Sequence, residues 1–305
     1  MSSRPSKIIH SYYRYIYIAV AIFIVIYFLF KLVQLFTSSL FFVDNSRINI
    51  LFYGQETAYY SIDKKDARHY VMYFPADIKM QVPGGYGTYR VGSLGKLAKL
   101  DSNFELLKKT FSVGTTSFVT YYFYDDVDTV FYGNTVPEER KKPKISDIWF
   151  LKSNAGFFDK LYLTLTFLQK KKDEFYIIAY QEKENKALND VFFQEESFIK
   201  NSIGLLYQSQ YRDEQKSIQI QYATSYDVAQ SVGSLLEGNG IRVSDISIDL
   251  EKNKNCIIIE SSEVPSRTSQ DLAAFFNCPI QKRKTDVYDI VFILGNEEKS
   301  WEIVN

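Results

Sequence analysis

The residues best suited to chemistry lie in one short stretch, YFPADIKMQVPGGYGTYRV, residues 73–91. The stretch holds one acid, Asp77, and one base, Arg90, around a turn rich in proline and glycine. Together the two side chains could form an active site. The same residue types are also typical of a hairpin, in which Asp77 is a turn residue and Arg90 is a cross-strand surface charge. Both interpretations stay open at the level of these residues.

Two other clusters suggest a ligand but fit it poorly. Gly84, Gly85 and Gly87 resemble a phosphate cradle, but no lysine follows in the P-loop arrangement and no helix clearly opens there. The three aspartates of YYFYDDVD, residues 121–128, suggest calcium, but the stretch lacks the glycine and the terminal glutamate of an EF-hand loop. We therefore expect a turn at the glycines and a solvated strand end at the aspartates.

The elements that position these residues begin with an N-terminal membrane span. Residues 15–36 break their apolar character only at Lys31 and Gln34, and about 20 such residues cross a bilayer as a helix. A secretory signal peptide is the alternative, but its apolar region is typically about 7 to 15 residues, and TSSLFF is a poor cleavage site. Basic residues before the span predict that residues 1–14 form a cytoplasmic tail and that the bulk of the chain is extracytoplasmic.

That topology places the two cysteines, Cys256 and Cys278, in a compartment that permits disulfides. A bridge between them is one interpretation, and two free, buried thiols in neighbouring elements are the other, because sequence cannot give the Cα separation that a disulfide requires. A histidine-based metal site is disfavoured, since His10 and His69 are distant in sequence and His10 is expected on the other side of the membrane.

Composition and charge argue against one broad class of partner. The 305 residues are 46% hydrophobic and 24% charged, which is ordinary for a globular protein and long enough for two modest domains. The 36 basic and 36 acidic residues balance, so no global positive field favours nucleic acid. We expect no nucleic-acid partner.

The first predicted extracytoplasmic domain covers residues 45–215. Strands are expected at RINILFYG, residues 47–54, and at HYVMYF, residues 69–74. SIDKKDAR, residues 61–68, is expected to be a polar connection between them. The apolar spacing of EESFIKNSIGLLYQSQYRDEQ, residues 195–215, predicts a core-facing helix.

The second predicted domain covers residues 216–305 and alternates compactly. Its segments follow the order βαββαβ, which usually folds as a small sheet with both helices on one face. Ser266 is expected to cap the second helix at its N-terminus. The expected fold class is α+β (α-β-α): a transmembrane helix, a mixed αβ domain and this small C-terminal domain.

These segments resemble a known family of bacterial cell-wall proteins. A single span followed by INILFYG and FPADIKMQVPGGYGTYRV is similar to the opening of the LytR-CpsA-Psr family, and the likeness covers residues 47–95. SYDVAQSVGSLLEGNGIRV and the terminal DIVFILG resemble the LytR C-terminal domain, over nearly all of the second predicted domain. The resemblance implies a transferase that moves glycopolymers from a polyprenyl-pyrophosphate carrier onto peptidoglycan, assisted by a divalent cation such as magnesium.

The resemblance also implies which residues would act. The family's Asp-Thr pair corresponds to Glu56 and the residue after it, and its Pro-Arg-Asp corresponds to residues 75–77. Glu56 and Asp77 would then hold the metal, and Arg90 would clamp phosphate. Ala76 stands where the family has an arginine.

The missing arginines decide the activity that we expect. A pyrophosphate leaving group needs several guanidinium groups, and Arg140 and Arg212 are isolated and in the wrong settings to supply them. Losing one donor that stabilises transition-state charge costs about a hundred- to a thousandfold in rate. We therefore expect a degenerate, non-catalytic relative, a pseudoenzyme that acts as a wall-associated scaffold or binds peptidoglycan, a wall glycopolymer or a partner. The alternative is an active transferase that binds the polyprenyl-phosphate lipid and uses magnesium.

Overall fold

The computed structural model describes residues 6–43, 45–64, 68–125, 127–133, 141–179, 182–185, 190–251 and 253–304. The chain divides into two compact units. The first combines Met1–Asp44 with Gly156–Leu165, and the second combines Asn45–Ala155 with Thr166–Asn305. Residues 1–5 of the expected cytoplasmic tail lie outside the described residues.

The first unit contains the N-terminal helix α1, Ser6–Thr37. Within the described ranges α1 is the one helix long and apolar enough to cross a membrane, over Tyr15–Thr37, and none of that stretch is buried in the protein. The sequence predicted this apolar helix at residues 15–36. A turn follows α1, and the unit also holds the first part of α5, Phe157–Gln169.

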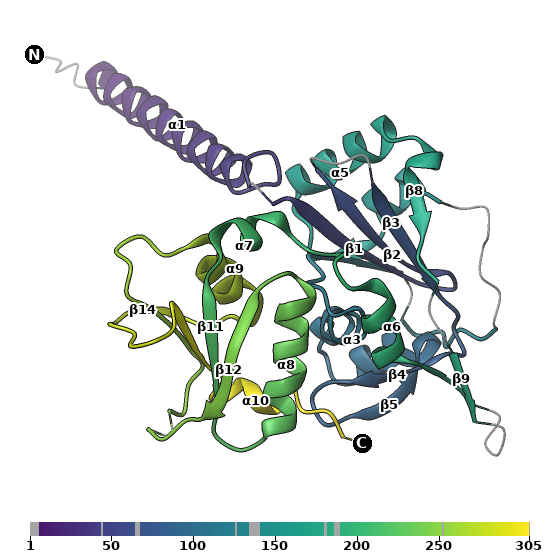
Figure 1. Cartoon of the computed structure of the whole chain (residues 1–305). Coiled ribbons are helices and arrows are strands. Elements are labelled where there is room, and N and C mark those ends of the chain that lie inside the picture. The colour runs from purple at the N-terminus through teal and green to yellow at the C-terminus, as the bar shows by residue number, and fades with distance from the viewer. Residues whose placement is uncertain are drawn as a thin grey trace, which may run out of the picture. The chain divides into compact units, whose positions relative to one another are not determined.

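The second unit is built on a six-stranded mixed sheet, whose strands β1, β2, β3 and β8 lie side by side in Figure 1. β1 pairs antiparallel with β2 and parallel with β6, and β3 pairs antiparallel with β2 and parallel with β8. Every residue of β1 and β2 is buried, which explains why their sequences do not alternate between polar and apolar residues. The order across the sheet is β7 (Lys152–Ser153), β6 (Tyr121–Tyr124), β1 (Arg47–Tyr53), β2 (Thr57–Asp63), β3 (His69–Phe74) and β8 (Phe175–Ile177).

Strand β2 corrects one sequence prediction. Residues 61–68 were expected to form a polar connection, but β2 runs through Ser61 and Ile62 to Asp63. The polar ends of this strand are satisfied inside the protein: Ser61 donates its hydroxyl to Asn49 at 2.7 Å, and Asp63 pairs with Arg47 at 2.8 Å. Tertiary partners therefore override the polar pattern here.

A second, four-stranded sheet contains the two strands of the hairpin within residues 73–91. Its order is β5 (Gly87–Arg90), β4 (Lys79–Val82), β10 (Asp190–Phe193) and β9 (Glu182–Asn185). Helices α2 (Leu94–Leu100) and α3 (Glu105–Thr115) follow β5, and a further helix, α4, spans Ile145–Phe150. One core joins this region to the large sheet through Tyr59, Met72, Phe74, Val82, Leu94 and Phe111.

The helix expected over residues 195–215 is two helices. α6 covers Glu195–Ser202 and α7 covers Ser209–Glu214. The chain turns between them, where Gly204 has a φ of 83°. Because a positive φ ends helical geometry and suits glycine best, the apolar spacing continues across a break that it does not reveal.

The C-terminal part follows the predicted order and adds a short strand and a short helix. Its elements are β11 (Ser217–Tyr222), α8 (Tyr226–Gly238), β12 (Arg242–Ile248), β13 (Ile257–Glu260), α9 (Arg267–Phe276), β14 (Ile280–Lys282), β15 (Ile290–Ile293) and α10 (Glu297–Ser300). The sheet order is β12-β11-β15-β13-β14. The Ser266 hydroxyl accepts from the Ser269 amide at 3.2 Å, which confirms the predicted cap of α9.

Both α8 and α9 pack on one face of this C-terminal sheet. Their buried side chains, such as Leu235 and Leu272, share a core with Ile218 and Phe292 of the strands. The same core includes Phe118, which precedes residue 216. The C-terminal sheet is therefore packed against the rest of the second unit rather than isolated from it.

Candidate functional site

Asp77 and Arg90 lie close together where the chain leaves the large sheet. Asp77 follows β3 and Pro75, and Arg90 is the last residue of β5. One carboxylate oxygen of Asp77, Oδ1, is 3.9 Å from Nη1 of Arg90, and Oδ2 accepts a hydrogen bond from the Gly133 amide at 3.0 Å. The two side chains are 32% and 45% exposed. The stretch is thus a hairpin that also brings its acid and base into contact.

Residues 131–133 complete this cluster. The Tyr132 ring lies 5.9 Å from the guanidinium carbon of Arg90, and the Tyr132 backbone carbonyl accepts from the Gln55 side-chain amide at 3.0 Å. Glu56 follows Gln55 and is exposed in the turn between β1 and β2. Asp77, Arg90 and the turn that carries Glu56 therefore all border one segment, and we refer to these residues as the Asp77–Arg90 cluster.

Ala76, which stands where the family resemblance expects an arginine, is 2% exposed. Its carbonyl accepts from the Gly92 amide at 2.8 Å, and the Gly92 carbonyl accepts from the Phe131 amide at 3.0 Å. A Cβ atom added at Gly92 would lie 2.2 Å from the Phe131 carbonyl oxygen and 3.0 Å from the Ala76 Cβ. The chain itself therefore fills the space beside Ala76.

Arg212, which the sequence analysis names as an isolated arginine, does not join the cluster. Arg212 lies over the Tyr207 ring, with 5.5 Å between the guanidinium carbon and the ring centroid, and packs beside Gly240. Arg140 lies outside the described residues.

The glycine-rich turn between β4 and β5 binds protein rather than presenting free amides. Gly84, Gly85 and Gly87 all have positive φ values, of 96°, 80° and 78°. The amides of Gly84 and Gly85 both donate to the Glu302 carbonyl, at 2.8 and 3.0 Å. Because these donors are taken by the C-terminal segment, the turn is a docking point for that segment and does not form a phosphate cradle.

The described residues around Asp77 do not form a ready-made metal site. Among the residues that the structure describes, no group of three or more His, Cys, Asp or Glu side chains could hold a metal ion. The Asp77 carboxylate is already shared between the Gly133 amide and Arg90. Of the aspartates considered for calcium, Asp128 pairs with Lys99, and Asp126 lies outside the described residues.

His69 is a structural residue. It is wholly buried, its Nδ1 accepts from the Asp63 amide at 3.3 Å, and Nε2 is 3.8 Å from a Glu174 oxygen. Burial, aided by the charge of Lys170, lowers the pKa of His69 to about 4. The imidazole is therefore neutral at physiological pH.

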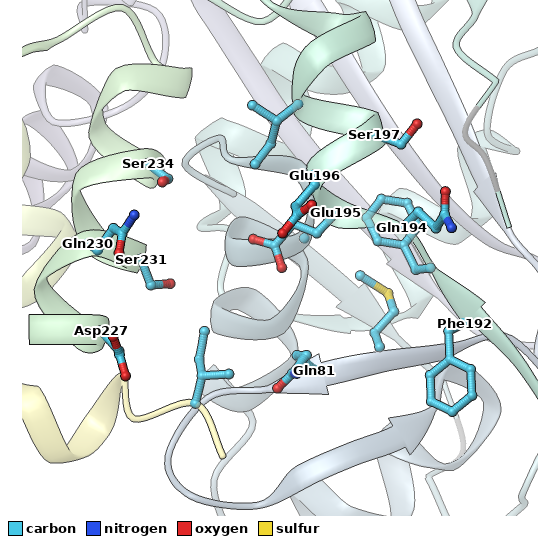
Figure 2. Close-up of a pocket in the computed structure, with 15 residues that line it drawn as sticks. Gln81, Phe192, Gln194, Glu195, Glu196, Ser197, Asp227, Gln230, Ser231 and Ser234 are labelled. Carbon is cyan, nitrogen blue, oxygen red and sulfur yellow. The ribbon is translucent and has the colours of Figure 1, made fainter. Parts of the chain in front are cut away.

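A cavity of about 730 Å³ lies away from the Asp77–Arg90 cluster, between α6 and α8. Figure 2 shows Glu195 and Glu196 of α6 on one side and Ser231 and Ser234 of α8 on the other. Burial, and to a smaller extent the neighbouring Glu196 carboxylate, raise the pKa of Glu195 to about 7. The sequence predicted helices at these residues but not the cavity, because α6 and α8 are brought together only by tertiary packing.

A polar groove of about 600 Å³ lies on the C-terminal sheet, on the face opposite the helices. Gln219 and Gln221 of β11 line its floor, because strand residues alternate between faces and the isoleucines between them point into the core. The Gln219 amide donates to Asp245 at 2.8 Å and to Ser247 at 2.9 Å. Tyr288 lines the same groove.

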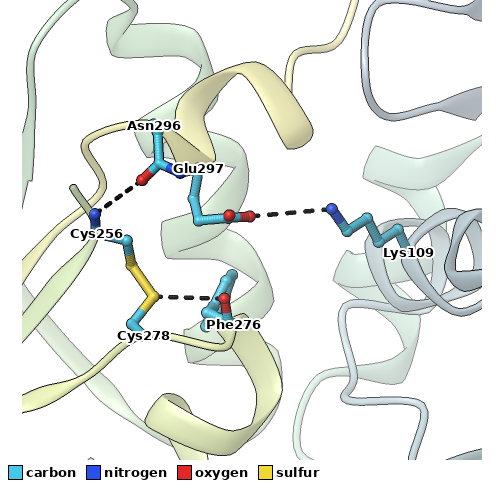
Figure 3. Close-up of a disulfide and its surroundings, with 6 residues drawn as sticks. All are labelled: Lys109, Cys256, Phe276, Cys278, Asn296 and Glu297. Atoms are coloured by element: carbon cyan, nitrogen blue, oxygen red, sulfur yellow. Dashed lines mark hydrogen bonds and ion pairs between the residues drawn. A yellow bond between two sulfur atoms is a disulfide. The ribbon is translucent and has the colours of Figure 1, made fainter. Parts of the chain in front are cut away.

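A disulfide joins Cys256 and Cys278, whose Cα atoms are 5.4 Å apart. Figure 3 shows its surroundings: the Cys256 amide donates to the Asn296 side chain at 2.9 Å, and Glu297 pairs with Lys109 of α3 at 4.0 Å. The bridge therefore borders the segment through which the C-terminal part contacts α3.

No protein-family model matches the sequence, and no curated protein matches it. Several solved structures do. The LytR-CPS2A-psr family protein YwtF (TagT) of B. subtilis, solved with bound octaprenyl pyrophosphate lipid, is 12% identical; the match covers 51% of this chain and 87% of that one, with a TM-score of 0.35. B. subtilis TagV is 10% identical, with coverage of 65% and 99% and a TM-score of 0.37. The Bacillus subtilis transcriptional regulator yvhJ is 14% identical, with coverage of 52% and 96% and a TM-score of 0.35.

The chain is thus similar to solved LytR-CpsA-Psr proteins, the family that its sequence resembles.

Proposed function

We propose that this protein is a membrane-anchored, extracytoplasmic component of the bacterial cell envelope, a non-catalytic LytR-CpsA-Psr relative that binds wall glycan. In this proposal α1 spans the cell membrane once, with residues 1–14 in the cytoplasm. Residues 45–215 form the degenerate family domain, and residues 216–305 form the glycan-binding part. The ligand is peptidoglycan or a glycopolymer attached to it.

The observation that supports the lack of catalysis most strongly is the packing of Ala76. Gly92 lies beside the Ala76 side chain and is itself bonded to Phe131, so protein backbone occupies the space next to the position where the family resemblance expects an arginine. Arg90 is then the guanidinium left at the Asp77–Arg90 cluster among the residues that the structure describes, and it is shared with Asp77. One partly neutralised cation is a weak match for the charge of a pyrophosphate.

The polar groove on the C-terminal sheet supports glycan binding. Side-chain amides and hydroxyls can both donate to and accept from sugar hydroxyls, and an aromatic ring can pack on a sugar face. Gln219, Gln221, Ser247 and Tyr288 supply these groups within one groove. The groove also contains both acidic and basic side chains, such as Asp245 and Arg283, which suits a polar ligand of low net charge.

Cosedimentation with insoluble peptidoglycan tests this proposal. The full chain in lipid nanodiscs is expected to sediment with the wall material, and Gln221→Ala and Tyr288→Ala should each weaken retention several-fold, up to about tenfold for a loss of about 1.4 kcal/mol. Gln270→Ala is the matched control, because Gln270 lies on α9 and bonds the Pro265 carbonyl instead. Absence of retention, or equal loss in Gln221→Ala and Gln270→Ala, would contradict glycan binding by this groove.

The alternative function is an active transferase acting on a polyprenyl-pyrophosphate glycopolymer. One observation favours it: Asp77 and Arg90 meet at 3.9 Å, with the Tyr132 ring beside the guanidinium. A residual phosphate-binding site would need both side chains in one place and accessible to a ligand, and both are partly exposed. Turnover of the lipid substrate separates the two functions directly.

A further inference from the structure

The end of α1 is joined to the start of α5 by a cluster of aromatic rings within the first compact unit. The ring of Phe36, in the last turn of α1, lies 5.0 Å from that of Phe158 and 5.0 Å from that of Phe42. Phe41 lies 5.5 Å from Phe36 and 5.2 Å from Tyr162. Residues far apart in the sequence therefore meet where the apolar helix ends.

Asp159 fixes this arrangement through its carboxylate. Oδ1 accepts from the Leu40 amide at 2.9 Å, which ties the turn after α1 to α5. Oδ2 accepts from the Gly156 amide at 3.2 Å, which closes the start of α5. Contacts inside the first unit therefore hold Gly156–Leu165 against the end of α1.

This cluster leaves large apolar side chains exposed. Phe157 is 65% exposed, Phe42 is 58% exposed and Leu165 is 42% exposed. Exposed apolar area costs about 25 cal/mol per Å² in water, and clustered apolar side chains at a surface mark an interaction site. Phenylalanine and leucine side chains are typical of the apolar face with which an interfacial helix enters the lipid.

We propose that residues 38–42 and Gly156–Leu165, named here the interfacial segment, lie in the lipid–water boundary at the C-terminal end of α1. The occupant of this apolar surface is the bilayer itself. Phe36 is one residue from the end of the apolar stretch Tyr15–Thr37. The rings that contact Phe36 therefore lie at the same depth as the end of the span. The proposal rests on the membrane span of α1 that is part of the proposed function.

Tryptophan fluorescence in lipid vesicles tests the interfacial segment in the full chain. Phe157→Trp places an indole on the exposed ring position, and emission from the two native tryptophans is measured in the unaltered chain and subtracted. We expect blue-shifted emission that is quenched by phospholipid brominated near the acyl carbonyl and protected from aqueous acrylamide. Phe42→Trp is a second probe on the other arm of the segment and should behave in the same way.

Phe28→Trp separates failure of this inference from failure of the anchor, because Phe28 lies near the middle of the apolar stretch Tyr15–Thr37. Its emission should be quenched most by lipid brominated near the acyl terminus. If Phe28→Trp is quenched by lipid while Phe157→Trp and Phe42→Trp are quenched only by acrylamide, the interfacial segment is in water and the inference is overturned. If Phe28→Trp is not quenched by lipid, the membrane span itself is wrong and the inference falls with it.

Discussion

The large sheet and the C-terminal sheet differ in how much of their surface is buried. β1 and β2 are buried along their whole length, and where the chain leaves β3 the Gly92 backbone, which is bonded to Phe131, packs beside Ala76. The C-terminal sheet buries one face under α8 and α9 and carries a polar groove on the other. The space beside Ala76, where the family resemblance expects an arginine, is thus filled by the chain, while the C-terminal sheet keeps an open groove. This difference favours binding over catalysis.

The largest expected effect comes from removing the disulfide. This change also tests whether the large sheet and the C-terminal sheet unfold together. Changing Cys256 and Cys278 to serine removes a bridge across 22 residues and should lower the free energy of unfolding by about 3 kcal/mol. Denaturant unfolding of the full chain with hydrogen exchange measures this loss. Protection should fall first in β13 and α9. An equal early loss in β1 and β2 would mean that the two sheets form one cooperative unit.

The packing beside Ala76 predicts the next effect. Gly92→Ala should lower the free energy of unfolding by about 1 to 3 kcal/mol, because the added methyl group would overlap the Phe131 carbonyl. Gly54→Ala is the matched control, since a Cβ atom there meets no atom within 4 Å. Thermal or denaturant unfolding compares the two variants. Equal stabilities would contradict the account of a filled site.

The sequence predicted the features that depend on residues close together in the chain, and it missed those that depend on residues far apart in the chain. The strand at residues 69–74 and the cap at Ser266 were predicted because their signals are local: branched and aromatic residues in one case, a side-chain cap in the other. The meeting of Asp77 and Arg90 also follows from one hairpin. The packing of Gly92 and Phe131 beside Ala76 and the cavity beside Glu195 could not be predicted, because each depends on segments brought together only by tertiary packing.

A pH effect tests the cavity between α6 and α8. The pKa of Glu195 is about 7 in the folded chain and 4.5 ordinarily, so between these values the folded state holds a proton that the unfolded chain releases. Stability should therefore fall as pH rises through this window. A shift of this size corresponds to about 3 kcal/mol for a wholly buried group, and the partial exposure of Glu195 reduces the expected fall to about 1 to 2 kcal/mol. Glu195→Gln should remove that fall, measured by unfolding at several pH values, whereas Glu263→Gln, an exposed control, should keep it. An unchanged pH profile in Glu195→Gln would contradict the burial of this carboxyl.

The smallest expected effect concerns the Asp77–Arg90 pair. Both side chains are partly exposed and 3.9 Å apart, so Asp77→Asn and Arg90→Ala should each change the free energy of unfolding by less than about 1 kcal/mol. Chemical unfolding checks this. A much larger loss would show that the pair holds the hairpin and residues 131–133 together, and would weaken its use as a test of activity.

Release of polyprenyl phosphate tests the central claim most directly. The full chain in nanodiscs is mixed with a polyprenyl-pyrophosphate glycopolymer, peptidoglycan and magnesium, and the lipid product is measured over time. The account predicts no release above that of nanodiscs without protein, with no difference between the unaltered chain, Asp77→Asn and Arg90→Ala. Magnesium-dependent release that either substitution abolishes would contradict it and establish the protein as an active transferase.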